Sequence, residues 1–372
     1  MKELAAELKK YKQVFVVCDR NVLPFAERLA STAGADTAEK CARDSDNTKA
    51  DATGKRVWPL LAITANEAHK TIDTVMEICR WLCDNGADRD ALVLAVGGGV
   101  TTDMAGFAAS IYKRGIRYAN IPTTLLSMVD AGIGGKTGVN LDGYKNLLGV
   151  IRQPEFTAIF PEVLETLPER EFRSGLAEML KTFIIKNPRR AYERTVALMG
   201  CSPGAASALA DGELAELIQL AAGIKQEIVE KDEFETGLRR KLNLGHTWAH
   251  AIEWWQKGSF AGARNDRRFA RNDRSFAQND TTFTHGEAVA IGMVQAARIS
   301  EKLGIAEEPG LAERIRKDLQ ACGLPTELPC PEQELLPAIL KDKKAYGSKI
   351  KLVLPCKIGK VVVLPIEVCS LS

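Results

Sequence analysis

The sequence is poor in histidine, in net charge and in long apolar runs, and each shortage excludes a class of protein. Its 372 residues include four histidines, and the formal net charge is +2. So small a charge creates no long-range field for nucleic acid or for an anionic membrane. No apolar stretch reaches the roughly 18 residues needed to span a bilayer. A polyanionic ligand would therefore have to be held by a local cluster of lysine and arginine.

Cysteine is present but lacks the spacing of a structural framework. The nine cysteines are an odd number, are scattered, and include no Cys-x-x-Cys pair. Reduced, mostly buried thiols of a cytoplasmic protein explain this pattern better than disulfides or a cysteine-based zinc site. Residues 1–4 also lack the basic-then-apolar layout of a signal peptide. We therefore expect a cytoplasmic location.

The first part of the chain alternates strand and helix signals. Residues 14–18 and 91–96 are short apolar runs closed by turn residues, as in buried parallel strands. Between them, residues 65–82 place apolar side chains on one helical face, and the polar residues 35–55 suit a surface connection. We expect an α/β domain at 1–165, built on a doubly wound parallel sheet.

Beyond residue 161 the pattern changes to helical periodicity, and strand signals almost vanish until residues 349–365. We expect a mainly α-helical domain at 166–372. Within it, residues 259–280 hold three near-copies of one unit that is rich in Arg and Asp and has no extended apolar face. Such a segment is typical of a loosely ordered inserted loop. The helical signals lie at 176–185, 213–229, 287–303 and 311–322.

Glycine-rich segments follow the second expected strand. The run Gly97-Gly98-Gly99 opens a helix, where backbone N–H groups can approach a phosphate, although a tight turn without a ligand is the alternative. Residues 122–146 then combine glycines, hydroxyls, amides and lysines. Such an array can hold a polyhydroxylated, phosphorylated anion, and a flexible glycine-rich loop is the competing interpretation.

Three of the four histidines lie close together in the sequence. His246 and His250 are four residues apart, so a helix would present both on one face, and His285 follows downstream. Neutral imidazole binds Zn²⁺ and carries protons near neutral pH, although a polar pair on a solvated helix has the same spacing. Glu178 and Lys181 share another helical face among apolar neighbours, where a charged pair is costly unless it is used. One carboxylate and two imidazoles can form a catalytic metal site with open positions.

An ordered series of motifs resembles the 3-dehydroquinate synthase family. The similarity runs from about residue 12 to residue 365, and its motifs occur in the family's order. They are GGGVTTDMAGFAAS, NIPTTLLSMVDAGIGGKTGVN, YKNLLG, SGLAEMLK, ETGLRRKLNLGHTWAHAIE and HGEAVAIGM. The resemblance implies a Rossmann-like, NAD-binding N-terminal domain and a mainly helical, metal-binding C-terminal domain. It also implies a homodimer.

The family converts 3-deoxy-D-arabino-heptulosonate 7-phosphate to 3-dehydroquinate and phosphate in the shikimate pathway of aromatic amino acid biosynthesis. The resemblance implies a transient oxidation by NAD, phosphate elimination, re-reduction and an intramolecular aldol cyclisation. NAD is regenerated in each cycle and so acts as a catalyst. The implied cofactors are NAD and Zn²⁺ or Co²⁺. The implied partner is a small phosphorylated sugar acid, with no role for nucleic acid or a membrane.

The resemblance also implies roles for individual residues. The metal ligands would be Glu178, His246 and His285, while His250 and Glu235 would exchange protons with the substrate. The other implied catalytic groups, which would also contact the substrate, are Lys136, Asn146, Lys181, Lys225, Arg239 and Asn243. Further substrate contacts would be Arg114, which in this family reaches across the dimer, Asp130 and Lys343. The implied NAD contacts are Asp19, Glu67, Lys70, Gly97, Gly98, Gly99, Asp103, Thr123, Thr124, Lys145, Thr166 and Leu167.

The chain departs from the family's pattern in three places. Ala65-Asn66 stands where the family has Asp-Gly ahead of Glu67, which puts the affinity for the cofactor in doubt. The family's Ser-Ser after Asp130 is Ala131-Gly132 here, which should alter the stiffness of the loop more than its chemistry. The repeat at 259–280 lengthens the connection to the third expected metal ligand, and such insertions cost little closure entropy.

Three alternatives remain beside this interpretation. Sister cyclases of the same superfamily act on glucose 6-phosphate or sedoheptulose 7-phosphate, but the Gly-Gly-Lys-Thr and Leu-Asn-Leu-Gly-His runs fit the dehydroquinate branch. An NAD-dependent polyol dehydrogenase of the glycerol dehydrogenase type would release NADH and would need fewer cations for phosphate and carboxylate. A binding protein without activity would not need the complete set of ligand and acid–base residues.

Overall fold

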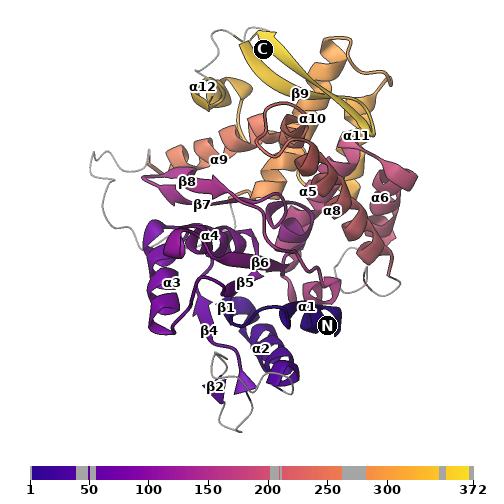
Figure 1. Cartoon of the computed structure of the whole chain (residues 1–372). Helices are drawn as coiled ribbons and strands as arrows, with labels where there is room; N and C mark the ends of the chain where they lie inside the picture. Colours follow the sequence, from indigo (N-terminus) through magenta and orange to yellow (C-terminus); the bar gives the residue numbers. More distant parts are fainter. Residues whose placement is uncertain are drawn as a thin grey trace. The chain divides into compact units, whose positions relative to one another are not determined.

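The structure is a computed structural model that describes residues 2–38, 49–50, 56–201, 209, 212–261, 282–342 and 349–367. The chain divides into two units, Met1–Val163 and Leu164–Ser372, each with its own helices and strands (Figure 1). The division falls where the hydrophobic pattern changes from strand–helix alternation to helical periodicity.

A four-stranded parallel sheet forms the centre of the first unit. Its strand order is β4 (Leu60–Ile63), β1 (Val14–Asp19), β5 (Leu92–Gly97) and β6 (Arg117–Pro122). Every residue of β5 is buried, because helices cover both faces of the sheet, as expected for a parallel sheet. The chain passes from β1 to β4 on one side and from β5 to β6 on the other. The connections therefore diverge between β1 and β5, where doubly wound sheets bind ligands.

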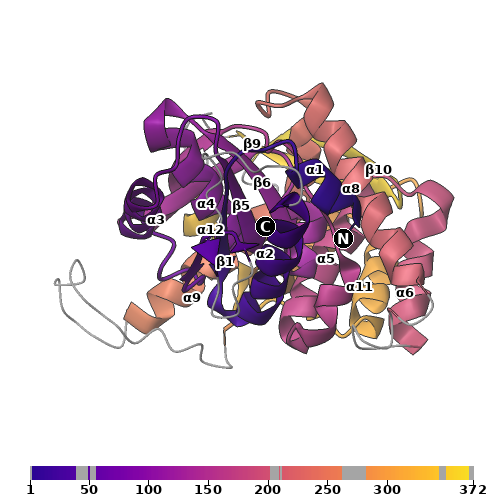
Figure 2. The ribbon, with the colours of Figure 1, turned by 60° about the horizontal axis from the view of Figure 1, so that its bottom comes forward.

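Four helices cover this sheet: α1 (Lys2–Leu8), α2 (Leu23–Ala38), α3 (Ile72–Asp84) and α4 (Gly99–Ile111). Alternate strand residues belong to two separate cores. Val16 and Leu94 pack with α1 and α2, whereas Val17 and Val93 pack with α3 and α4. Figure 2 shows the two helix pairs on opposite sides of the strands. A short ladder of β2 (Lys49–Ala50) and β3 (Arg56–Val57) lies outside this sheet.

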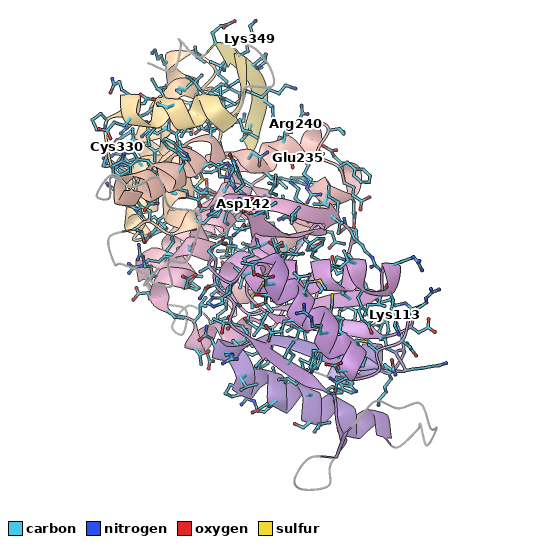
Figure 3. All side chains as sticks on the ribbon, turned by 90° about the vertical axis from the view of Figure 1, so that its left-hand side faces the viewer. Lys113, Asp142, Glu235, Arg240, Cys330 and Lys349 are labelled. Atoms are coloured by element: carbon cyan, nitrogen blue, oxygen red, sulfur yellow. The ribbon has the colours of Figure 1, made fainter. Side chains whose placement is uncertain are left out.

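A β-hairpin follows the sheet, and it was not expected from the sequence. Strands β7 (Lys136–Leu141) and β8 (Tyr144–Ile151) are antiparallel and are joined at Asp142 and Gly143. Both turn residues have positive φ, 48° and 82°, as a two-residue type I′ turn requires (Asp142 is labelled in Figure 3). The glycine-rich composition of 122–146 concealed this Asp-Gly signal.

Two boundaries expected in the first unit are wrong. The helix expected at 65–82 begins at Ile72, because the Thr71 side chain caps it by accepting a backbone N–H from its first turn. The connection expected at 35–55 begins with the last residues of α2 and includes β2, and the rest of that segment lies outside the described residues.

Helices dominate the second unit, and α10 is at its centre, in contact with α5, α9, α11 and β9. The helices are α5 (Glu169–Ile185), α6 (Ala191–Cys201), α8 (Glu213–Lys231), α9 (His246–Ala261), α10 (His285–Lys302), α11 (Leu311–Ala321) and α12 (Glu332–Asp342). A hairpin of β9 (Lys349–Lys357) and β10 (Lys360–Glu367) follows them. The predicted fold class, a Rossmann-like α/β unit followed by a mainly helical one, is therefore confirmed.

The described residues also bear on the cysteines, the membrane and the repeat. Seven cysteines are described and all are free, but only three of them are buried, so the expectation of mostly buried thiols is wrong. No described helix has the length and apolar character required to cross a membrane. Of the repeat at 259–280, the first three residues end α9 and the others lie outside the described residues.

Candidate active site

Glycine contacts hold three helices of the second unit close together. A Cβ atom on Gly286, in the first turn of α10, would lie 2.0 Å from the Ser174 carbonyl oxygen on α5. A Cβ on Gly292, two turns further along α10, would lie 2.0 Å from the carbonyl oxygen of Gly245, just before α9. The Gly286 N–H also donates to Ser174 Oγ at 3.0 Å. Helix α10 is therefore held against α5 and α9 at separations that no larger residue permits.

Each of these helices contributes one expected metal ligand to a single cluster. Glu178 comes from α5, His246 from α9 and His285 from α10, and their ligand atoms lie within 4.8 Å of one another. Glu178 Oε1 is 3.3 Å from His285 Nε2 and 3.8 Å from His246 Nε2. Two ligands of one tetrahedral Zn²⁺ stand about 3.4 Å apart. The spacing therefore suits a shared ion.

Glu178 has the environment of a ligand to a cation. Its side chain is fully buried, and among the described residues neither carboxylate oxygen accepts a well-formed hydrogen bond, although Lys181 contacts one oxygen as an ion pair. A buried carboxylate is costly unless positive charge and hydrogen bonds compensate for it. A cation between Glu178 and the two imidazoles would supply that compensation, so the residues present fit a metal ion with open coordination positions.

Acceptors on the far side of each imidazole orient the Nε2 atoms towards Glu178. His246 Nδ1 lies 3.2 Å from the Leu244 carbonyl oxygen, and His285 Nδ1 lies 2.9 Å from Glu253 Oε1. Burial opposes protonation of His285, but its contacts with Glu178 and Glu253 outweigh burial and raise its pKa to about 10. Sequence reasoning gave Glu253 no role. Its position seven residues after His246, two turns along the same face, was the available signal.

His250 lies beside the cluster but is not one of its ligands. Its ring centroid is 5.5 Å from that of His246, in an edge-to-face arrangement, and its side chain is exposed. An imidazole one helical turn from a ligand and open to solvent is placed for proton exchange, the role that the resemblance implies.

A loop between α8 and α9 carries three further expected residues. Asp232 holds this loop, because its Oδ2 accepts the N–H groups of Gly237 at 2.8 Å and Arg239 at 2.9 Å. These backbone hydrogen bonds, that from Arg239 first, hold the pKa of Asp232 below its usual range. Glu235, labelled in Figure 3, has a φ of 58° and accepts from Asn243 Nδ2 at 2.6 Å. Left-handed residues other than glycine persist where the surroundings hold them, often at functional sites.

The second unit also buries cations that the sequence singled out. Lys181, Lys225 and Arg239 are each less than a tenth exposed, on α5, on α8 and in the 3₁₀ turn Leu238–Asn243. Lysine and arginine are rarely buried without a structural partner or a ligand. Arg239 has a partner, since its Nη1 donates to the Glu233 carbonyl at 2.5 Å. Lys343 lies outside the described residues.

The expected NAD contacts of the first unit gather at one edge of the sheet. Each follows the carboxyl end of a parallel strand, where doubly wound sheets bind their ligands. Asp19 ends β1, Gly97 ends β5, and Thr123 and Thr124 follow β6, while Glu67 and Lys70 come after β4. Two other expected contacts, Thr166 and Leu167, belong to the second unit.

The glycines after β5 have a packing role as well as a possible ligand role. A Cβ on Gly97 would lie 2.4 Å from Thr101 Oγ1, and one on Gly99 would lie 2.8 Å from the Ala131 methyl group. Packing alone therefore requires small residues here. Helix α4 nevertheless begins at this turn with no side chain capping its N–H groups, so a phosphate can be accepted there. The residues present thus fit a dinucleotide.

A buried ion pair connects the expected cofactor and substrate residues of this unit. Lys70 is 4% exposed, and its Nζ lies 2.5 Å from Asp103 Oδ2 and 2.6 Å from Asn146 Oδ1. Asn140, to which no role was assigned, accepts the Asn146 N–H at 2.9 Å and donates to Glu67 Oε2 at 2.9 Å. Four expected ligand contacts are thus parts of one hydrogen-bonded network.

The other expected residues of the first unit lie on its surface or at partly buried positions. Arg114 is exposed and closes the turn Tyr112–Arg114 with a φ of 67°. Lys136 and Lys145 are exposed at the starts of β7 and β8, and Asp130 is partly buried in the helical turn before β7.

Comparison with known proteins gives a consistent result over most of the chain. The 3-dehydroquinate synthase N-terminal model matches residues 60–174, and the corresponding C-terminal model matches residues 175–260 and 276–345. The 3-dehydroquinate synthase of Dictyoglomus thermophilum is 39% identical over 312 residues, which cover 81% of this chain and 77% of that protein.

Solved structures with the same fold include two other sugar-phosphate cyclases. One is 2-epi-5-epi-valiolone synthase from Streptomyces hygroscopicus subsp. jinggangensis 5008, with NAD⁺ and Zn²⁺ bound. It is 26% identical, with a TM-score of 0.79 over 98% of this chain and 91% of that one. The other, a 2-deoxy-scyllo-inosose synthase complexed with carbaglucose-6-phosphate, NAD⁺ and Co²⁺, is 21% identical, with a TM-score of 0.74 over 99% of this chain and 92% of that one. Because the family models and the 39% identical relative agree, this chain belongs to the 3-dehydroquinate synthase family.

Proposed function

We propose that this protein converts 3-deoxy-D-arabino-heptulosonate 7-phosphate to 3-dehydroquinate and phosphate, as its family does. The observation that carries the proposal is the cluster of Glu178, His246 and His285, with His250 one helical turn away. Membership of the dehydroquinate branch, rather than of the sister cyclases, indicates the substrate.

The chain's own residues have separate tasks in this reaction. When bound, NAD supplies the transient oxidation and re-reduction at C5 of the substrate, and Zn²⁺ or Co²⁺ polarises the hydroxyl that is oxidised. Glu178, His246 and His285 would hold the metal ion. His250 would take the proton from the C5 hydroxyl, and Glu235 would act as a second proton acceptor.

Cationic side chains would bind the two anionic groups of the substrate. Lys181, Lys225 and Arg239 are buried, and a buried cation pairs with carboxylate or phosphate more strongly than an exposed one. The remaining contacts would come from Arg114, Asp130, Lys136, Asn146, Asn243 and Lys343. The NAD contacts would be the residues at the carboxyl edge of the sheet, with Gly98, Asp103, Lys145, Thr166 and Leu167.

A cytoplasmic homodimer fits these observations. The seven described cysteines are free, which suits a reducing compartment. Strand β8 exposes several apolar side chains, with Tyr144 and Leu147 each 57% exposed, and exposed apolar strands often pair with a partner. Arg114 would then reach the neighbouring site, as the family resemblance implies.

The direct test is phosphate release from 3-deoxy-D-arabino-heptulosonate 7-phosphate, with absorbance at 340 nm followed in parallel. The enzyme would carry metal and catalytic NAD⁺. We expect stoichiometric phosphate and no net NADH, because the reduced cofactor is reoxidised within each cycle. Accumulating NADH would indicate a polyol dehydrogenase. Phosphate release only from glucose 6-phosphate or sedoheptulose 7-phosphate would indicate a sister cyclase.

His250→Ala serves as the matched variant in this assay. It removes the proposed proton acceptor and leaves the three ligands in place. We expect bound metal to be unchanged and turnover to fall by roughly 10² to 10⁴-fold, the usual contribution of a general acid–base group. Loss of metal from His250→Ala would contradict the proposed division of roles.

A further inference from the structure

We propose that Glu253 is a positioning residue that holds the His285 ring so that Nε2, and not Nδ1, binds the metal ion. The inference rests on the proposed metal site and adds a residue to it. It is carried by the contact between Glu253 Oε1 and His285 Nδ1, at 2.9 Å, between two helices.

The contact determines which nitrogen of His285 bears the proton. A carboxylate only accepts hydrogen bonds, so at 2.9 Å the Nδ1 atom must be the N–H donor. The lone pair of the neutral ring then lies on Nε2. That atom is the one 3.3 Å from Glu178 Oε1, on the side of the cluster. The ring is thus held in the tautomer and direction that ligation requires.

His246 has the same arrangement with a different acceptor. Its Nδ1 lies 3.2 Å from the backbone carbonyl of Leu244, a group that the α9 turn itself supplies. His285 stands at the first position of α10, where no such carbonyl contact is present among the described residues, and its side chain is 33% exposed. Its orientation therefore depends on a side chain from another helix. The Glu253 side chain is 11% exposed, which keeps the contact away from competing water.

Removing this acceptor should weaken metal binding without removing a ligand. Mutation of such an outer carboxylate typically lowers metal affinity by about 10- to 100-fold. We expect Glu253→Leu to lie in that range and Glu253→Gln to stay close to wild type, because its amide oxygen can still accept from Nδ1–H. The experiment is a chelator competition that measures the dissociation constant of Zn²⁺ for the full chain, and it does not depend on turnover.

A second readout reports the geometry itself. In the Co²⁺-loaded protein, Glu253→Leu should change the visible absorption of the ion because one imidazole is no longer held. In the Zn²⁺-loaded wild-type protein, ¹⁵N NMR of the histidine rings should show His285 protonated at Nδ1 and bound through Nε2. Ligation of His285 through Nδ1 would overturn the inference even if no variant folds.

Glu334→Leu is the matched control. Glu334 also accepts a hydrogen bond from a ring N–H of α9, that of Trp255 Nε1 at 2.9 Å, and it lies far from the ligand atoms in its contacts. We expect its zinc affinity to equal that of wild type. Equal affinities in Glu253→Leu and wild type would overturn the inference and leave the proposed function standing. A wild-type protein that binds no metal would overturn both.

Discussion

Single residues decide how charge is buried in the first unit. Lys70 is 4% exposed and pairs with Asp103, whose side chain is 17% exposed. Removing one member of a buried pair leaves the other without its counter-ion, and this usually costs more than the pair contributes.

Lys70→Met should therefore destabilise the protein by roughly 3 kcal/mol, the low end for buried pairs because Asp103 keeps some contact with water. Urea unfolding monitored by circular dichroism would measure the change. The double variant Lys70→Met with Asp103→Asn should recover part of the loss, since the unpaired carboxylate is then gone. A double variant as unstable as the sum of the two single changes would show that the residues are not coupled.

Residue types and spacing were enough to select the expected ligands but not their supports. Glu178, His246 and His285 stood out because carboxylate and imidazole have few other uses among apolar neighbours. Glu253 and Asn140 did not, because an acid on a helix and an amide in a strand are ordinary. Their roles depend on contacts across elements, which no spacing in the sequence reveals.

At the scale of elements, the packing of α10 places the ligands. Gly286 adjoins His285, and Ser174 lies one turn before Glu178, so the closest approach of the two helices is next to two of the ligands. Any increase in the separation of α10 and α5 at this point would separate Glu178 from His285.

Gly286→Ala tests this dependence. Its Cβ would lie 2.0 Å from a backbone oxygen that cannot rotate away, so α10 must shift. We expect zinc affinity to fall by at least tenfold and stability to fall by about 1–3 kcal/mol, the usual range for overpacking. Gly200→Ala, with open space around its Cβ, is the control, and thermal unfolding with a zinc titration would measure both effects. Unchanged zinc affinity in Gly286→Ala would show that the approach of α10 to α5 does not determine the site.

Elements were predicted well where the hydrophobic period was long and less well where turns decided them. The helical signals of the second unit and the strands β1 and β5 follow from periodicity and burial. The β7–β8 hairpin was missed because its glycines resembled those of a loop, and the start of α3 was misplaced because Thr71 ends the preceding turn. Both errors concern local turn chemistry.

For the whole molecule, the family comparison isolates one stretch as an addition. The family model matches residues 175–260 and resumes at 276, which leaves 261–275 unmatched within the repeat. The expected ligands His246 and His285 lie on either side of it. A segment without a counterpart in the family should contribute little to binding or turnover.

Deletion of 262–275 should therefore leave zinc content and phosphate release within about twofold of wild type, because changing the length of a loop alters its closure entropy only slightly. Metal analysis of the purified deletion protein and the phosphate assay would measure these quantities. A deletion protein that is folded but free of metal would contradict the expectation and would assign the repeat a part in holding the site.

The three-helix origin of the metal cluster has a consequence for the order of events during synthesis. Glu178 leaves the ribosome long before His285, and neither can meet the other until α10 has formed and docked by its glycines. A nascent chain therefore offers passing ions only the weak His246–His250 pair. The ion is then chosen by the finished fold, whose rigid cavity can discriminate among metals, and not by the growing chain, which would accept whichever ion arrived first.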